Sequence, residues 1–194
     1  MVLAGDYLTR EEVDNNRRLQ VGNRVKKSAA TMTTMVNDLL EYARTQLGGK
    51  MPIVHERSDM GEICQSAMED ASAAHPDCPF ELETSGDVVD YFDNARLHQV
   101  FSNLLNNAAQ YRAKDRPVTI SANGDTFDVN VQVKNFGPVV PAESLESIFQ
   151  PLVQLPVDAQ PLGRPSSSVG PVLFIARELT VAHGGLLTVA SSET

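Results

Sequence analysis

Apolar residues in the first fifty positions recur at the spacing of a helix. Steps of mostly three and four residues separate Val21, Val25, Ala29, Met32, Val36, Leu39, Ala43 and Leu47. This pattern predicts one long amphipathic helix, which Gly48-Gly49 ends. Ahead of it, Leu3 to Leu8 fit the tail of a preceding helix, and Thr9 fits a cap. We therefore expect residues 1–50 to form a helical hairpin or its second arm.

The narrow apolar stripe of the long helix indicates that this helix pairs with another helix. Its repeat is close to the 3.5-residue period of a coiled coil, and a seam over about four turns needs a partner helix. We therefore expect a homodimer through the N-terminal helices. The alternative is a single helix that packs on the domain following it.

From Met51 onward the pattern changes to short strands and helices. Strands are predicted at 52–57, 80–85, 88–92, 117–122, 127–133 and 186–190, and helices at 60–74, 94–111, 142–148 and 172–183. Asp59, three residues before Glu62, forms a capping box, and Asp93 caps the next helix. Asn123-Gly124-Asp125 is a hairpin signal. A four- or five-stranded, mostly antiparallel sheet covered by helices gives an α+β, two-layer sandwich over residues 51–194.

Residues 149–171 form a long stretch without a periodic pattern. It holds five prolines, two glycines and a serine triplet. Such a stretch inside a compact domain is usually a lid or a binding loop. We expect one of these here.

Composition and charge argue against several classes of protein. The 194 residues carry a formal net charge of −9, which repels nucleic acid and anionic lipid, so neither is an expected partner. No apolar run approaches the roughly 20 residues that span a bilayer, and we expect a cytoplasmic protein without direct membrane contact. Cys64 and Cys78 are too few for a disulfide framework, and neither they nor the scattered histidines have the spacing of a zinc site.

The predicted helix at 94–111 has an unusual polar face. Opposite its apolar side lie Arg96, Gln99, Asn103, Asn106, Asn107 and Gln110. Three asparagines within five residues cost helix propensity that lysine or glutamate would not. Asn103 and Asn107 lie one turn apart, so their amide oxygens could reach magnesium and their amide nitrogens could reach phosphate oxygens. The alternative is an ordinary polar face that strong packing behind it tolerates.

Four segments in order resemble the ATP-binding domain of sensor histidine kinases, which gyrase and the heat-shock chaperones share. RLHQVFSNLLNNAAQY resembles the N box, KNFGPVVP the first glycine box, IFQPL the phenylalanine box, and SSVGPVLFIARELTVAHGG the second glycine box with its helix. NDLLEYARTQLGG resembles the end of the dimerisation and phosphoacceptor hairpin of that family. The resemblance covers about Arg17 to Ser192. It implies a partial hairpin at 1–50 and the family's ATP-binding domain at 51–194, without that domain's final strand.

The resemblance also implies site residues, position by position. Asn107 takes the place of the magnesium ligand, and Asn103 faces the triphosphate. Asn135 stands where most members have the Asp that accepts a hydrogen bond from the adenine amino group, a bond that an amide oxygen can also accept. The other ATP-binding residues it implies are Gln110, Tyr111, Gly137, Arg164, Ser168, Gly170 and Leu173.

Several departures from the family pattern weaken the expected phosphate cradle. Val139 replaces a glycine, and Gly170 is the one glycine left of three in the second glycine box. Pro171 has no backbone N–H to offer an anion, and Gln110 stands where a cation is common. ATP and magnesium are therefore the expected cofactors, with weakened binding and with Arg164 as the remaining counter-charge.

The resemblance implies phosphoryl transfer to a histidine, yet no histidine precedes His55. We expect the C-terminal part of a sensor histidine kinase of a two-component system. It would act on a histidine outside this chain, with a response regulator receiver domain as partner, and would not autophosphorylate alone. The alternative is a non-catalytic dimeric interaction module with a degenerate pocket. A third interpretation is an ATP-hydrolysing relative of the gyrase and chaperone branch. That branch usually needs a glutamate as general base on this helix, and Asn103 occupies the position where we would seek it.

Overall fold

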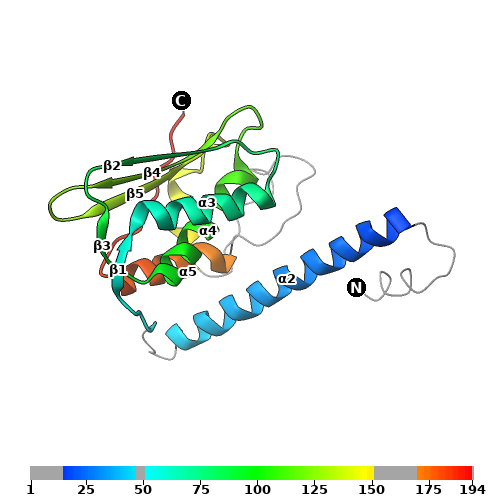
Figure 1. Cartoon of the computed structure of the whole chain (residues 1–194), viewed down its shortest axis with the longest axis horizontal. Helices are drawn as coiled ribbons and strands as arrows, with labels where there is room; N and C mark the ends of the chain where they lie inside the picture. The colour runs from blue at the N-terminus through cyan, green and yellow to red at the C-terminus, as the bar shows by residue number, and fades with distance from the viewer. Residues whose placement is uncertain (1–14, 47–50, 151–169, 194) are drawn as a thin grey trace.

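The computed structural model describes residues 15–46, 51–150 and 170–193 (Figure 1). In chain order the elements are helix α2 (Asn15–Gln46), strand β1 (Glu56–Asp59), helix α3 (Met60–Ala74), strands β2 (Phe80–Ser85) and β3 (Val89–Phe92), helix α4 (Asn94–Tyr111), strands β4 (Val118–Gly124) and β5 (Val129–Lys134), the 3-10 turns η1 (Ala142–Ser144) and η2 (Ser147–Phe149), and helix α5 (Gly170–Ala182).

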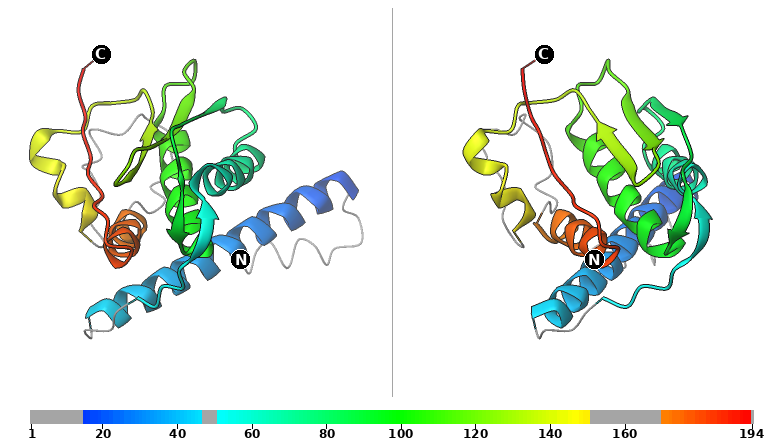
Figure 2. Two further views of the ribbon diagram at one scale, coloured as in Figure 1. Left: turned by 60° about the vertical axis from the view of Figure 1, so that its left-hand side comes forward. Right: turned by 90° about the vertical axis from the view of Figure 1, so that its left-hand side faces the viewer.

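Helix α2 is one uninterrupted helix, as the apolar spacing predicts. It extends past the rest of the fold and packs against α5 (Figures 1 and 2). Three apolar residues on its second half, Met32, Val36 and Leu40, are about half exposed. The predicted preceding segment at Leu3 to Leu8 and the stop at Gly48-Gly49 lie outside the described residues. No described helix is long and apolar enough to cross a bilayer.

Two layers make up the body of the fold: a three-stranded sheet, and α3, α4 and α5 on one of its faces (Figures 1 and 2). The strand order is β2-β4-β5, and the side chains of β2, β4 and β5 alternate between the helices and solvent. Val118, Ile120 and Ala122 of the central strand face the helices and are fully buried, and the core also takes in the apolar face of α4. The predicted two-layer α+β fold is confirmed.

The predicted single, mostly antiparallel sheet is wrong in two respects. Strands β1 and β3 form a separate two-stranded antiparallel ribbon, and β2 pairs with β4 in parallel, in the register Leu82 to Ile120. The connection from β2 to β4 runs through β3 and α4, which is the kind of long crossover that parallel pairing requires.

The hairpin signal is confirmed, but the turn lies further along the chain. Asn123 and Gly124 belong to β4 and pair with β5, and the turn is Asp125 to Asp128. The Asp125 carboxylate accepts hydrogen bonds from the backbone N–H groups of Phe127 and Asp128, at 2.7 and 2.9 Å. These bonds lower the pKa of Asp125. The side chain that stabilises the turn is therefore the aspartate.

Three further expectations are corrected. The strand predicted at 52–57 begins only at Glu56, because the Val54 N–H donates to the Asp93 carboxylate and not to a strand. The helix predicted at 142–148 is the two short turns η1 and η2. Residues 186–190 form no strand: Leu187 packs on the core while Leu186 stays 77% exposed, so little apolar burial favours pairing there.

The segment predicted as a lid or binding loop is flanked by a small apolar cluster of its own. Ile148 and Phe149 of η2 and Leu173 of α5 are each at most 8% exposed and pack together. Helix α5 then runs to Ala182, close to the predicted end, and is followed by Gly184 at φ +81°. The left-handed conformation at this position suits glycine. Residues 151–169 lie outside the described part of the chain.

Candidate functional site

Helix α4 positions the candidate site, and its first turn is fixed by Asp93. One carboxylate oxygen accepts from the Arg96 N–H at 3.1 Å, as an N-cap does, and the other accepts from the Val54 N–H at 2.9 Å. Burial is the largest single influence and raises the pKa of Asp93. These two N–H bonds, with the nearby His183 and Arg96 side chain, outweigh it, and the pKa is lowered.

The backbone N–H of Asp93 has a partner as well. It donates to His183 Nε2 at 3.2 Å, while His183 Nδ1 lies 2.8 Å from the Leu179 carbonyl oxygen. When Nε2 accepts the Asp93 N–H, Nδ1 is the ring nitrogen placed to donate to the Leu179 carbonyl oxygen. The sequence predicts the Asp93 cap but not this connection between α4 and the end of α5.

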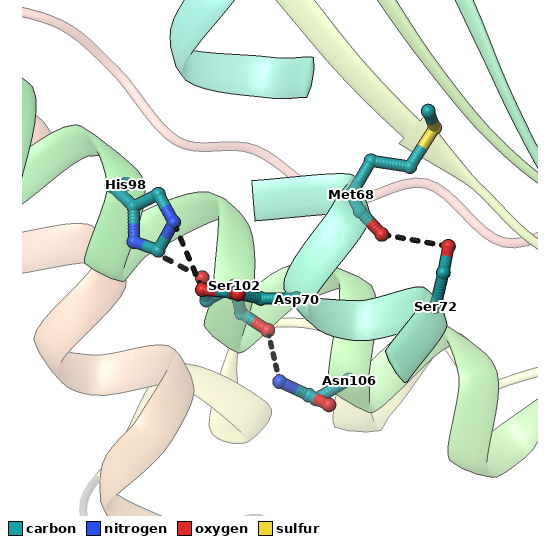
Figure 3. A network of polar contacts seen from close by, with 6 residues as sticks. All are labelled: Met68, Asp70, Ser72, His98, Ser102 and Asn106. Atoms are coloured by element: carbon teal, nitrogen blue, oxygen red, sulfur yellow. Dashed lines mark hydrogen bonds and ion pairs between the residues drawn. The ribbon is translucent and has the colours of Figure 1, made fainter. Parts of the chain in front are cut away.

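The three asparagines on α4 divide into two kinds. Asn106 is exposed and fully engaged: its Nδ2 donates to the Ser102 carbonyl oxygen at 2.7 Å, and its Oδ1 lies 2.9 Å from His75 Nε2. Figure 3 shows Asn106 and Ser102 in the polar network between α3 and α4, where His98 also lies 3.3 Å from the Asp70 carboxylate. Asn106 thus has a structural role that spacing alone does not separate from its neighbours.

Asn103 and Asn107 are different. Both are half-buried, and within the described residues neither side chain has a hydrogen-bonding partner. The Asn103 Nδ2 is itself buried. A buried donor without an acceptor costs about 1–3 kcal/mol, so such a group in a folded protein asks for an explanation. Two free carboxamides one turn apart can together supply donors to an anion and oxygens to a hard cation.

The loop after β5 lies against the C-terminal end of α4. The Ala113 N–H donates to the Phe136 carbonyl oxygen, and a Cβ added at Gly137 would collide with the Tyr111 carbonyl oxygen. Glycine is therefore required for this close approach. Asn135, at the start of the loop, is exposed and makes no hydrogen bond within the described residues. The fold thus brings Asn135 and Gly137 to the end of the helix that carries Asn107.

The other predicted site residues are placed as follows. Gln110 and Tyr111 are half-buried on the last turn of α4, and Gly170 is the first residue of α5. Leu173 is buried in the cluster with Ile148 and Phe149, which is a packing environment. Arg164 and Ser168 lie outside the described residues. Val139 is 43% exposed, so it does not fill interior space.

Other chemistry is poorly supported in the described part of the chain. The Cys64 thiol has its pKa raised to about 12, mainly by burial and also by Asp59, so it stays protonated and unreactive. No group of three or more histidine, cysteine or carboxylate side chains there could hold a metal. A surface groove between α3 and β2 contains Asp59, Glu62 and Glu69, whose charges disfavour a phosphate ligand.

Comparison with known proteins identifies the family of this arrangement. A family model described as "Histidine kinase-, DNA gyrase B-, and HSP90-like ATPase" matches residues 92–194, which begin immediately before the Asp93 cap. The probable sensor histidine kinase TcrY of Mycobacterium tuberculosis is 33% identical over 171 residues, covering 88% of this chain and 35% of TcrY. The chain thus spans about a third of the length of this curated relative.

Solved structures show the same fold. Full-length ShkA in complex with AMPPNP superposes with a TM-score of 0.71 at 21% identity, covering 98% of this chain and 42% of ShkA. The ATP-binding domain of PrrB from Mycobacterium tuberculosis gives a TM-score of 0.57 at 22% identity, covering 71% of this chain and 88% of that domain. The chain belongs to the histidine kinase-, DNA gyrase B- and HSP90-like ATPase family, and sensor histidine kinases are among its sequence relatives.

Proposed function

We propose that this chain is the C-terminal part of a sensor histidine kinase of a two-component system and binds magnesium-ATP between α4, the loop at Asn135 and the start of α5. The observation that carries the proposal is the pair of carboxamides at Asn103 and Asn107, which have no hydrogen-bonding partner among the described residues and one of which has a buried donor. Asn106, between them in sequence, is fully engaged elsewhere. Among the three asparagines of α4, the two without a partner in the described residues are thus the two that can share a ligand.

The chemistry of these residues fits a nucleotide triphosphate. The Asn103 Nδ2 offers a hydrogen bond to a phosphate oxygen, which would satisfy the donor that is otherwise buried without a partner. The Asn107 Oδ1 is a suitable magnesium ligand. When bound, magnesium would neutralise charge on the phosphates and on the phosphoryl group in transfer. Gly137 lets the loop pack against the Tyr111 backbone, which brings Asn135 to the end of the helix that carries Asn107.

Affinity is expected to be modest because few positive charges are available. Gln110 supplies no charge, and Pro171 removes one N–H donor from the start of α5. The net charge of −9 opposes a ligand that carries about four negative charges. Arg164 is the counter-charge that the sequence offers in the segment predicted to be a lid or binding loop.

The partners follow from the same proposal. Residues 1–50 would belong to the dimerisation hairpin and residues 51–194 to the ATP-binding domain, with the phosphoacceptor histidine outside this chain. The half-exposed apolar residues of α2 would pair with a second copy. A response regulator receiver domain would accept the phosphoryl group.

Calorimetric titration with magnesium-ATP tests the proposal. We expect a Kd between about 1 µM and a few millimolar, and Asn107→Ala should weaken binding at least about tenfold by removing the magnesium ligand. The matched control is Asn106→Ala on the same helix, which should leave the Kd within about twofold because its carboxamide bonds only to the protein.

Two results would count against the proposal. Absence of ATP binding to the folded wild-type chain would favour the non-catalytic interaction module. Equal weakening by Asn106→Ala and Asn107→Ala would indicate a general effect on α4 and would remove the support that the two unpartnered carboxamides give.

A further inference from the structure

We propose that the outer edge of strand β5 pairs with the same edge of a second copy of this chain, in an antiparallel register that places Val131 opposite Val131. This assembly surface uses neither the candidate nucleotide site nor the exposed apolar residues of α2. Three features carry the inference: an open sheet edge, the direction of the backbone groups along it, and the charges at its two ends.

Strand β5 ends the three-stranded sheet, whose order is β2-β4-β5 (Figure 1). Within the described residues, no strand pairs with its outer side. The chain after α5 does not fill this place: residues 186–193 form no strand, and the Ser191 hydroxyl accepts from the Val140 N–H, past the end of β5. The strand contains no proline. An edge of this kind is a template for pairing with another strand.

The backbone groups of β5 alternate in direction. The Asp125 N–H donates to the Asp128 carbonyl oxygen at 3.0 Å, so the backbone of Asp128 bonds toward β4. Because hydrogen-bonded and non-hydrogen-bonded pairs alternate along an antiparallel ladder, Val129, Val131 and Val133 direct their N–H and C=O groups to the outer edge. These groups make no hydrogen bond within the described residues. The proposed register satisfies them, because Val131 pairs with its own copy and Val129 with Val133.

The side chains of the two copies match in this register. The three valines lie half-buried on the helix side of the sheet and pack against the core, so the apolar layer continues from one copy into the other. On the solvent side, Asn130 comes opposite Gln132. A shift by one residue would place valines opposite polar side chains, so it is disfavoured.

The charges select this register among those that keep the faces matched. Asp128 and Lys134 come opposite each other, once at each end because the interface has two-fold symmetry. Both side chains are exposed, and neither has an ion-pair partner in the part of the chain that the structure describes. The Lys134 ammonium lies 5.0 Å from the centroid of the Phe136 ring, a contact that leaves its N–H donors available. A shift by two residues in either direction separates the two charges.

Pairing through one strand is weak, because its hydrogen bonds replace bonds to water and exposed ion pairs contribute little. We expect a Kd of roughly 0.1–1 mM. At micromolar concentrations the edge is therefore unpaired. At high concentration, a chain that also pairs through α2 would form tetramers or longer assemblies, since two separate two-fold interfaces on one chain link dimers together.

Sedimentation equilibrium of Val36→Asp, the variant designed to remove pairing through α2, tests the inference. The weight-average mass should be at least about a third higher at about 1 mM than at about 10 µM. In the same background, Lys134→Asp brings two carboxylates together at each end of the interface and should weaken pairing at least about fivefold. The matched control is Lys26→Asp, the same charge change at an exposed position of α2, which should leave the Kd within about twofold.

A charge swap separates the edge from any effect on folding. Asp128→Lys combined with Lys134→Asp restores opposite charges in the proposed register, so the double variant should pair within about twofold of the Val36→Asp chain.

Three results would overturn the inference. The first is a mass that does not change between the two concentrations. The second is a double variant that pairs as weakly as Lys134→Asp, because the two charges then do not face each other. The third is equal weakening by Lys26→Asp, which would indicate a general effect of charge. These measurements need no nucleotide, so their outcome is independent of the proposed function.

Discussion

Among single residues, the asparagines of α4 show that one residue type serves two purposes on one helix face. Asn106 ties α4 to His75 at the end of α3, whereas Asn103 and Asn107 keep their carboxamides without a partner within the described residues. Asn106 strengthens the packing of the two helices. The buried Asn103 Nδ2 costs stability, and a ligand that accepts its hydrogen bond would remove that cost.

We therefore expect that replacing Asn103 raises the stability of the fold and weakens nucleotide binding. Asn103→Leu replaces the carboxamide by an apolar group of similar size and removes the unsatisfied buried donor. We expect the free energy of unfolding without ligand to rise by about 1 kcal/mol, and the melting temperature by about 2–4 °C. Nucleotide binding should weaken in the same variant. Thermal unfolding with and without magnesium-ATP measures both.

The control for this prediction is Asn106→Leu. Because it breaks the bonds to His75 and Ser102, it should lower the melting temperature. If Asn103→Leu is destabilised to the same degree, the Asn103 donor has an acceptor in solution and the argument from its burial is wrong.

The sequence predicts the asparagine pair because amides at helical spacing are unusual on a solvated face. It does not separate Asn106 from Asn103 and Asn107, because the partner of Asn106 is His75, 31 positions away. The same limit applies to Asp93: a cap is a local feature and is predictable, whereas its bonds with Val54 and His183 depend on the packing of three distant segments.

Among the elements, helix α2 exposes a row of apolar side chains to solvent. Met32, Val36 and Leu40 follow each other at one-turn spacing and are 50%, 56% and 55% exposed. A row of exposed apolar side chains on a long helix is the pattern of a helix–helix interface. The contact of α2 with α5 leaves this row uncovered.

We therefore expect Val36→Asp to convert a dimer of this chain into a monomer, because a charge in the middle of the row cannot be buried without a partner. Light scattering after gel filtration should give half the mass of the wild type. Asn23→Asp introduces a carboxylate at an exposed polar position of the same helix and should leave the mass unchanged. A monomeric wild type would contradict the prediction.

The elements that were predicted well have strong local signals. Helices α3 and α4 follow from their aspartate caps and apolar periodicity, and their ends agree with the sequence pattern to within a residue. The pairing of strands was predicted poorly. Parallel pairing of β2 with β4 depends on the path of the chain through α4, and the alternation of residues along a strand carries no information about direction.

Across the whole molecule, Asp93 is where the segment before β1 meets helices α4 and α5. Its side chain holds Val54 ahead of β1 and Arg96 in the first turn of α4, and its N–H bonds to His183 after α5. The fold therefore joins the segment after α2 to the two helices that flank the candidate nucleotide site.

This junction gives stability a defined pH dependence. Because the folded-state pKa of Asp93 is lowered, its ionised form stabilises the fold above the unfolded pKa of about 3.9, and that contribution is lost as the pH falls through the folded pKa. We expect Asp93→Asn to be less stable than the wild type at pH 6, with a difference that shrinks as the pH falls below the unfolded pKa of about 3.9.

Urea unfolding from pH 3 to 6 measures this difference. Asp115→Asn, at an exposed carboxylate between α4 and β4, corrects for the general effect of removing one negative charge. A difference between wild type and Asp93→Asn that stays constant over this pH range would show that the ionised carboxylate contributes nothing beyond a neutral cap.

The small cluster of Ile148, Phe149 and Leu173 has a consequence for the length of the segment between η2 and α5. It joins the chain on the two sides of residues 151–169 and adjoins the main core, since Leu104 and Leu187 pack against both. Each doubling of the length of a loop so closed costs only about 0.6 kcal/mol of chain entropy. A change in the number of residues between η2 and α5 should therefore cost the fold little as long as these three side chains stay packed together.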